Sequence, residues 1–125
     1  MNERTMERNA FFKGLILSTF LLISAIGLQA QTHPAATLIL RVDGLTAQER
    51  DALSQDLLNG TGLKLAYACV PAGLLVIAPA DPLSGIDPRS AAAASIGRTV
   101  TSARAHEESL TQQQVEARCS NARNQ

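Results

Sequence analysis

The chain is poor in aromatic side chains, and the part after residue 30 is poorer still. Its 125 residues include no tryptophan, one tyrosine and three phenylalanines. All three phenylalanines and both methionines precede residue 21, so Tyr67 is the one aromatic residue of the later part. Proteins that bind single-stranded nucleic acid stack bases on aromatic side chains. A core here must instead be built from Leu, Val, Ile and Ala, which bury less surface per residue than aromatics.

The chain also lacks an excess of charge of either sign. It carries 11 basic and 11 acidic residues. Without residues 1–30, which hold three basic and two acidic residues, eight basic and nine acidic residues remain. Nucleic-acid binding depends on a basic surface. We therefore predict no nucleic-acid partner.

The motifs of common enzyme classes are missing as well. The sequence contains no nucleophile elbow, no phosphate-binding glycine loop and no HExxH motif, and it has two histidines. A chain of this length also leaves little volume for a closed substrate pocket, which usually needs about 300 Å³ or more. We therefore predict a protein that is not an enzyme and holds no cofactor.

The N-terminal segment has the pattern of a secretory signal peptide. A weakly basic start is followed by an uncharged apolar run, Gly14–Leu28, and by a small residue, Ala30. The run is shorter than the roughly 20 apolar residues of a membrane-spanning helix. We expect residues 1–30 to be removed, residues 31–35 to form a flexible N-terminus, and residues 36–125 to form one extracytoplasmic domain, periplasmic or secreted, without a stable membrane span.

The first part of this domain predicts a strand and a helix. Residues 36–43 place apolar side chains at alternate positions, as a half-buried strand does. Thr46 precedes Glu49 by three residues, which is the spacing of a capping box at a helix N-terminus. Asn59-Gly60 is a helix stop, with Gly60 supplying the left-handed residue. One face of the predicted helix carries the apolar residues Ala52, Leu53, Leu57 and Leu58.

Residues 63–78 predict a β-hairpin. Its strands are separated by Val70–Gly73, which has proline and glycine at the positions that favour a type I turn. The alternation in the first strand places four residues on one face: Leu63, Leu65, Tyr67 and Cys69. The second strand, residues 74–78, is continuously apolar, as in a strand covered on both faces.

Two further helices are predicted after the hairpin. Asp87-Pro88 combines an N-cap with proline at the first helical position, and Gly97 is expected to end that helix. Thr99–Ala105 predicts either a weak fourth strand or a continuation of the helix. Thr111 and Gln114 form a second capping-box pattern, with Leu110 placed to pack on the following turn, and this last helix contains Cys119.

This order of elements indicates the α+β class. Strand, helix, hairpin, helix, weak strand and helix correspond to a ferredoxin-like βαββαβ sandwich with an appended C-terminal helix. The prediction is an antiparallel sheet with helices on one face.

The turn Gly44-Leu45-Thr46 is the one motif in this order that resembles a known family. It resembles the loop of heavy-metal-associated (HMA) domains, whose signature Gly-Met-Thr-Cys-x-x-Cys binds soft cations such as Cu(I). Ala47 and Arg50 stand where that family has its two cysteines, and Cu(I) needs soft sulfur ligands. The resemblance therefore implies a degenerate HMA-like domain without this metal site. Any strand-to-helix turn with a capping box shares the pattern, and Gly44, Leu45, Thr46 and Glu49 are expected to act as turn, staple and cap.

Cys69 and Cys119 are the two cysteines of the chain. Exported proteins enter compartments in which disulfides form and persist. We expect a disulfide that joins the last helix to the hairpin. A redox-active pair is a weaker alternative, because the sequence has no Cys-x-x-Cys motif. Metal-binding thiols and an intermolecular disulfide are further alternatives.

The two histidines suggest alternative metal chemistry. Cleavage after Ala30 would leave Gln31-Thr32-His33 at the N-terminus, and an N-terminal amine, two amides and an imidazole suit Cu(II) or Ni(II). Cyclisation of the N-terminal glutamine would remove the amine as a ligand. The simpler interpretation is that His33 is a terminal residue without a ligand role. His106, next to Glu107 and Glu108, is interpreted as part of a solvated connector between elements.

Together these patterns predict a small exported, non-catalytic binding or accessory module, braced by one disulfide, with a protein partner in the cell envelope. The alternative is an extracytoplasmic protein that handles copper, nickel or zinc through its processed N-terminus or its thiols. A homodimer formed through an exposed sheet face or edge is a third hypothesis, because open edges readily add strands.

Overall fold

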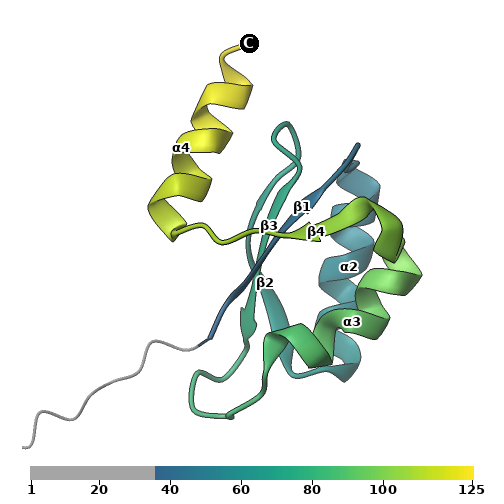
Figure 1. Cartoon of the computed structure of the whole chain (residues 1–125). Helices are drawn as coiled ribbons and strands as arrows, with labels where there is room; N and C mark the ends of the chain where they lie inside the picture. The colour runs from purple at the N-terminus through teal and green to yellow at the C-terminus, as the bar shows by residue number, and fades with distance from the viewer. Residues whose placement is uncertain (1–35) are drawn as a thin grey trace, which may run out of the picture. The chain divides into compact units, whose positions relative to one another are not determined.

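The computed structural model describes residues 36–125, and the predicted signal peptide and residues 31–35 lie outside this range. The described part has a four-stranded antiparallel sheet and three α-helices (Figure 1). The elements are β1 (Leu38–Val42), α2 (Ala47–Gly60), β2 (Leu63–Cys69), β3 (Leu74–Pro79), α3 (Pro88–Thr99), the 3₁₀ turn η1 (Ser102–Arg104), β4 (Ala105–Glu107) and α4 (Gln112–Arg123). This is an α+β fold, consistent with the predicted ferredoxin-like class.

The sheet has the strand order β2-β3-β1-β4. β2 and β3 form the predicted hairpin, and the Gly73 amide donates to the Val70 carbonyl across its turn at 3.0 Å. β1 pairs with β3 on one side and with the short β4 on the other. β2 and β4 are therefore the two edges of the sheet.

Side-chain caps fix where the helices begin. Thr46 and Glu49 form the predicted capping box of α2, and Thr111 and Gln114 form that of α4. Asp87 accepts hydrogen bonds from the first amides of α3, ahead of a proline at the first helical position. Each cap satisfies backbone N–H groups that have no partner within the helix.

The main core lies between the sheet and the pair α2 and α3. Its buried residues are all aliphatic, as the composition requires: Leu38, Leu40, Val42, Leu45, Leu53, Leu57, Leu63, Leu75, Ile77, Ala92, Ile96 and Val100. β1 and β3 supply alternate residues to this side, which is the period of two expected of strands. The apolar surface buried here is the main source of stability for the described domain.

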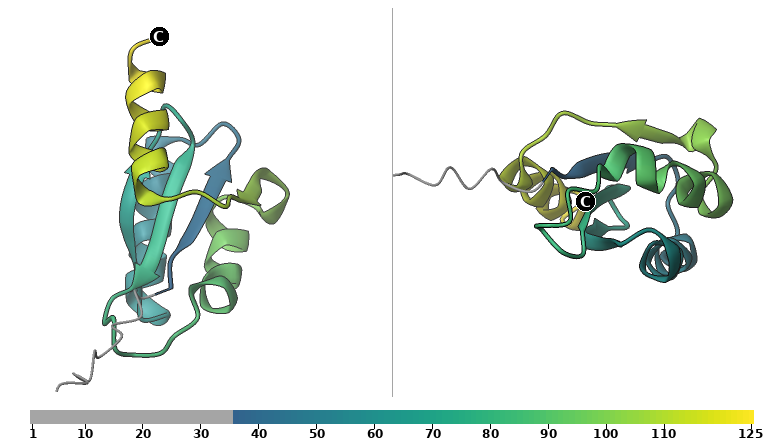
Figure 2. Two further views of the ribbon diagram at one scale, coloured as in Figure 1. Left: turned by 60° about the vertical axis from the view of Figure 1, so that its left-hand side comes forward. Right: turned by 90° about the horizontal axis from the view of Figure 1, so that it is seen from below.

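Helix α4 covers the opposite face of the sheet. In Figure 2 it lies on one side of the strands while α2 and α3 lie on the other. A second buried cluster fills this layer: Ile39, Cys69, Leu74, Val76, Val115 and Cys119. The expectation of helices on one face is therefore wrong for α4. Strand β3 is buried on both faces, as its continuous apolar run predicted.

Strand β2 contains a β-bulge that the sequence pattern did not predict. Leu65 pairs with Ile77 and Tyr67 pairs with Val76, so Ala66 has no partner on β3. The extra residue reverses the side on which the following residues lie. Leu63 and Leu65 consequently face α2 and α3, whereas Tyr67 and Cys69 face α4, and the predicted single face is wrong.

Helix α2 also differs from the prediction in its buried face and its end. Leu53 and Leu57 are buried, but Leu58 is 61% exposed and Ala52 is exposed too. The helix includes Gly60, and the left-handed residue after it is Gly62, with φ 70°. A side chain at Gly62 would also approach Ile86 to 2.7 Å.

The segment after α3 resolves the two alternatives for Thr99–Ala105. Helix α3 passes Gly97 and ends at Thr99, so the predicted end was two residues early. Thr101 then has a positive φ of 60° and leads into η1, and β4 begins only at Ala105. The fourth strand exists, but it is shorter and later than predicted.

Among the described residues, none of the helices combines the length and apolar character that crossing a bilayer requires.

Candidate functional site

The β1–α2 loop, Asp43–Thr46, is a tight turn at one end of the sheet. Gly44 has φ 67°, a conformation that glycine adopts without a steric cost. Leu45 is buried in the main core, and Thr46 accepts a hydrogen bond from the Glu49 amide at 3.1 Å. The three residues thus serve as turn, core contact and N-cap.

Arg104, on η1, holds this loop from the side. Its Nε donates to the Asp43 carbonyl at 2.9 Å, and its Nη2 donates to the Gly44 carbonyl at 2.9 Å. The same guanidinium forms a forked contact with the Glu49 carboxylate, at 2.6 and 3.2 Å. A planar guanidinium has the geometry for several hydrogen bonds in fixed directions. One side chain therefore connects the end of β1, the turn and the first turn of α2.

The charge of Arg104 changes the acidity of Glu49. Hydrogen bonds from Arg104, and from the Thr46 amide, lower the pKa of Glu49 from 4.5 to about 2. The Glu49 carboxylate in turn raises the pKa of Arg104. Both groups stay charged at any pH near neutrality, so the loop is held by an ionised pair.

A hollow of about 350 Å³ lies beside the loop. Its walls are Arg41–Leu45 on one side and the β2–β3 turn, Val70–Gly73, on the other. The two walls are joined by a hydrogen bond from the Val42 amide to the Gly73 carbonyl at 2.7 Å. The hollow is open to solvent and is bounded by two short, hydrogen-bonded turns.

Charged side chains line the rim of this hollow next to β4. Asp43 lies between two cationic or ionisable groups, with Arg41 at 3.2 Å from Oδ1 and His106 at 3.1 Å from Oδ2. Arg41 also contacts Glu108 at 3.1 Å. The pairing of β1 with β4 causes this arrangement, because Arg41 lies directly opposite His106.

His106 and Glu107 therefore belong to a strand and not to a connector, which corrects the prediction. Alternation along β4 separates the neighbours: His106 contacts Asp43, and Glu107 pairs with Arg89 of α3. Arg89 lowers the pKa of Glu107. Glu108 follows the strand, and its amide donates to the Ile39 carbonyl at 2.9 Å.

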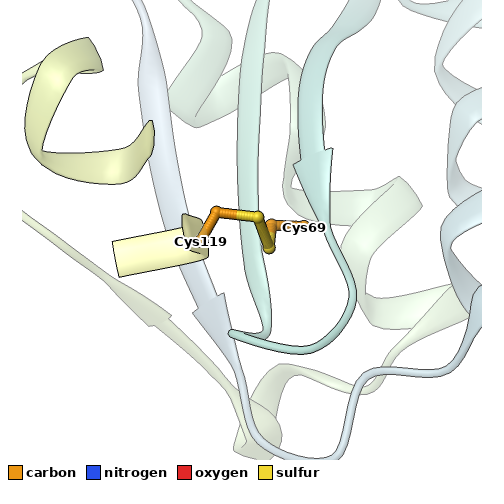
Figure 3. The surroundings of a disulfide bond; sticks show 2 residues. All are labelled: Cys69 and Cys119. Atoms are coloured by element: carbon orange, nitrogen blue, oxygen red, sulfur yellow. A yellow bond between two sulfur atoms is a disulfide. The ribbon is translucent and has the colours of Figure 1, made fainter. Parts of the chain in front are cut away.

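The two cysteines lie away from this loop. Cys69 and Cys119 form the predicted disulfide, with a Cα–Cα distance of 5.8 Å (Figure 3). Both residues are buried between the sheet and α4. In the described residues, no three His, Cys, Asp or Glu side chains are grouped so that they could hold one metal ion. His33 lies outside the described range.

Sequence reasoning found Gly44, Leu45, Thr46 and Glu49 but missed Arg104. Arg104 is 55 residues from Glu49, and no local pattern connects the two. The pattern of Thr99–Ala105 predicts a strand or a helix, and neither alternative includes a turn whose arginine holds the β1–α2 loop.

The comparisons with known proteins were negative. No protein-family model, curated protein or solved structure matches this chain. The geometry of the loop and the hollow is therefore the basis for interpreting the site.

Proposed function

We propose that the chain is a small exported, non-catalytic binding module with a ferredoxin-like domain braced by one disulfide. Its contact surface is the hollow between the β1–α2 loop and the β2–β3 turn. The expected partner is a protein of the cell envelope. Export is supported by the signal-peptide pattern of residues 1–30 and by the disulfide, which is consistent with an extracytoplasmic compartment.

The observation that carries this proposal is the way in which Arg104 holds the loop. Its guanidinium contacts two carbonyls and the Glu49 carboxylate, so the wall of the hollow is fixed before any partner arrives. A preorganised surface loses less conformational entropy on binding than a mobile one. A fixed, open hollow of this kind is suited to the recognition of a partner.

We further propose that the chain is a degenerate HMA-like domain, and this proposal rests on the Gly44-Leu45-Thr46 motif in an α+β fold. Arg104 places a positive charge against the Gly44 carbonyl, in the loop that resembles the HMA metal loop. Ala47 offers no ligand, and Arg50 pairs with Asp51 at 2.7 Å. A cation in this loop would meet a repelling charge and no thiolate. The module would have kept the fold of such a domain, and its β1–α2 loop would contact a protein partner instead of a metal ion.

A site-specific photo-crosslinker tests the proposed contact surface. It replaces Ala72, in the wall of the hollow, or Gln55, an exposed residue of α2, in the full chain expressed in its own cell envelope. We expect one discrete adduct from position 72 and none from position 55. An adduct of twice the chain mass would identify a second copy as the partner. Equal labelling from both positions, or none from position 72, would contradict the proposal.

Metal titration separates this function from the metal-handling alternative. The processed, oxidised protein is titrated with copper, nickel and zinc salts by calorimetry. The proposal expects no binding tighter than a Kd of about 10 μM, which corresponds to roughly −7 kcal/mol. Tighter binding that disappears in His33→Ala would establish the N-terminal metal site instead. Mass spectrometry of the same sample shows whether the mature chain begins at Gln31.

A further inference from the structure

Helix α4 forms a separate layer over the second face of the sheet. Val115 and Cys119 are its only buried residues within Gln112–Arg123. They rest on Ile39, Leu74 and Val76, with Leu110 just before the helix adding a partly buried contact. One of the two buried side chains is thus half of the disulfide.

The other contacts of α4 with the domain are weak. The one ion pair found between α4 and the rest of the described residues joins Arg118 to Glu108 at 3.8 Å, and both groups are partly exposed. Exposed ion pairs at such distances contribute little to stability. Among the described residues, the remaining side-chain hydrogen bonds of α4 are its capping box and a contact between Gln112 and Glu116 within the helix. Val115 and the disulfide therefore hold the helix in place.

The main core does not depend on α4. All twelve buried residues between the sheet and the helices α2 and α3 come from the chain up to Val100. The hydrogen bonds of the sheet likewise end at Glu108, whose amide reaches β1. Ser109 and Leu110 are the residues that connect this fixed point to the cap of α4 at Thr111.

We propose that α4 is a redox-held cover over the face of the sheet formed by Ile39, Leu74 and Val76. A dithiol reductant attacks one sulfur of the Cys69–Cys119 bond, forms a mixed disulfide, and resolves it with its second thiolate. Two electrons pass to the protein, the S–S bond becomes two thiols, and the reductant becomes a disulfide. After reduction, Val115, the Cys119 thiol and Leu110 are the contacts that remain with the sheet. These few contacts do not keep the twelve residues of α4 ordered, so the helix leaves and the apolar face is uncovered.

Local opening makes the buried sulfurs accessible to the reductant. Both cysteines are about 1% exposed, so reduction in the native state requires the helix to move first. Segments with few buried contacts open at lower free energy than the core. The polar composition of α4 and its two buried residues place it among such segments.

Hydrogen exchange measured by mass spectrometry tests the proposal. The processed protein is compared before and after treatment with dithiothreitol at neutral pH, with the reduced thiols blocked by iodoacetamide. We expect amides of residues 112–123 to exchange at least ten-fold faster after reduction, and at least ten-fold faster than the amides of α2, α3 and the sheet, which stay protected in the reduced protein. Binding of a hydrophobic dye should rise at the same time.

Two variants make the result unambiguous. Cys69→Ala with Cys119→Ala should show fast exchange in α4 without reductant and without an alkyl group. Val115→Ser with the disulfide intact should keep the α4 amides protected to within a few-fold. Protection of α4 in the reduced protein would overturn the proposal, and so would exchange in α2 and α3 that is as fast as in α4. Neither result tests the proposed binding role, which is decided by crosslinking of the oxidised protein at position 72.

Discussion

At the scale of single residues, the position of one guanidinium explains most of the geometry of the β1–α2 loop. Arg104 donates hydrogen bonds to the carbonyls of Asp43 and Gly44 and lowers the pKa of Glu49. Thr101, three residues earlier, has φ 60°, which is unfavourable for a β-branched residue. The backbone accepts this strain because Val100 is fully buried on one side of Thr101 and Arg104 is fixed on the other.

The contact between Glu49 and Arg104 predicts a pH dependence of stability. The pKa of Glu49 is about 2 in the folded state and 4.5 as the ordinary value, so the folded protein binds fewer protons in this range. Its stabilising contribution is complete above pH 4.5 and is lost as the pH falls toward 2. In urea unfolding between pH 6 and pH 2, Glu49→Gln should show a shallower acid decline than wild type.

Because the backbone of Thr101 is strained, we expect glycine at position 101 to increase the stability of the fold. Strain of this kind costs about 1–3 kcal/mol, and glycine adds back about 0.5–1 kcal/mol of unfolded-state entropy. Thr101→Gly should therefore raise the free energy of unfolding by about 1 kcal/mol. Thr99→Gly, two residues earlier in α3, should lower it by about 1 kcal/mol. Chemical denaturation measures both, and a loss in Thr101→Gly would show that the conformation carries no strain.

At the scale of elements, packing decided which residues of a correctly predicted helix or strand are buried. The apolar pattern of α2 is wider than the face it buries, because α3 and the sheet together cover only the stripe with Leu53 and Leu57. In β2, one unpaired residue redirects the second half of the strand to the other face. The alternating pattern of residues 63–69 does not reveal this change of face, because a bulge alters strand pairing and leaves the composition the same.

Leu57 and Leu58 offer a matched test of the α2 interface. Leu57 is 0% exposed and Leu58 is 61% exposed, although both were predicted on one apolar face. Leu57→Ala should lower the free energy of unfolding by about 2–5 kcal/mol through the lost burial and the cavity left behind. Leu58→Ala should change it by less than about 0.5 kcal/mol. Similar losses in the two variants would contradict the assigned helix orientation.

Because of the bulge, we expect deletion of Ala66 and deletion of Ala68 to have different effects on stability. Deleting Ala66 leaves Leu65 and Tyr67 opposite their present partners on β3, so stability should stay within about 1 kcal/mol of wild type. Deleting Ala68 removes the small side chain packed on the main core and brings Tyr67 to that face. Overpacking of this kind costs about 1–3 kcal/mol. In urea unfolding, the free energy of unfolding of wild type and of the Ala66 deletion should therefore be clearly higher than that of the Ala68 deletion.

At the scale of the whole molecule, the disulfide connects two layers that share little else. It closes a loop of 50 residues between the hairpin and α4. The domain is small and its aliphatic core is modest, so a covalent constraint is a large share of its stability. The residues that it joins are on the face opposite to α2 and α3, and Ala72, in one wall of the hollow, packs against them.

Removal of the disulfide should be among the most damaging of these changes. The chain-entropy estimate for a loop of this length is about 4 kcal/mol. The free energy of unfolding of Cys69→Ala with Cys119→Ala, measured without reductant, should fall by about that amount. Wild type in excess dithiothreitol should behave like the double variant. A loss below about 1 kcal/mol would show that the bond does not constrain the unfolded chain as proposed.

Local sequence determined the helix starts, the hairpin with its turn and the order of the elements, because capping boxes, turn residues and apolar periodicity act over a few residues. The cysteine pair was also foreseeable, since two cysteines leave one intramolecular pairing. Only the tertiary structure placed α4 on the second face, reversed the side of Tyr67 and Cys69, and brought Arg104 to the β1–α2 loop. Those outcomes depend on strand pairing and on contacts between residues more than 50 positions apart, which no local pattern encodes.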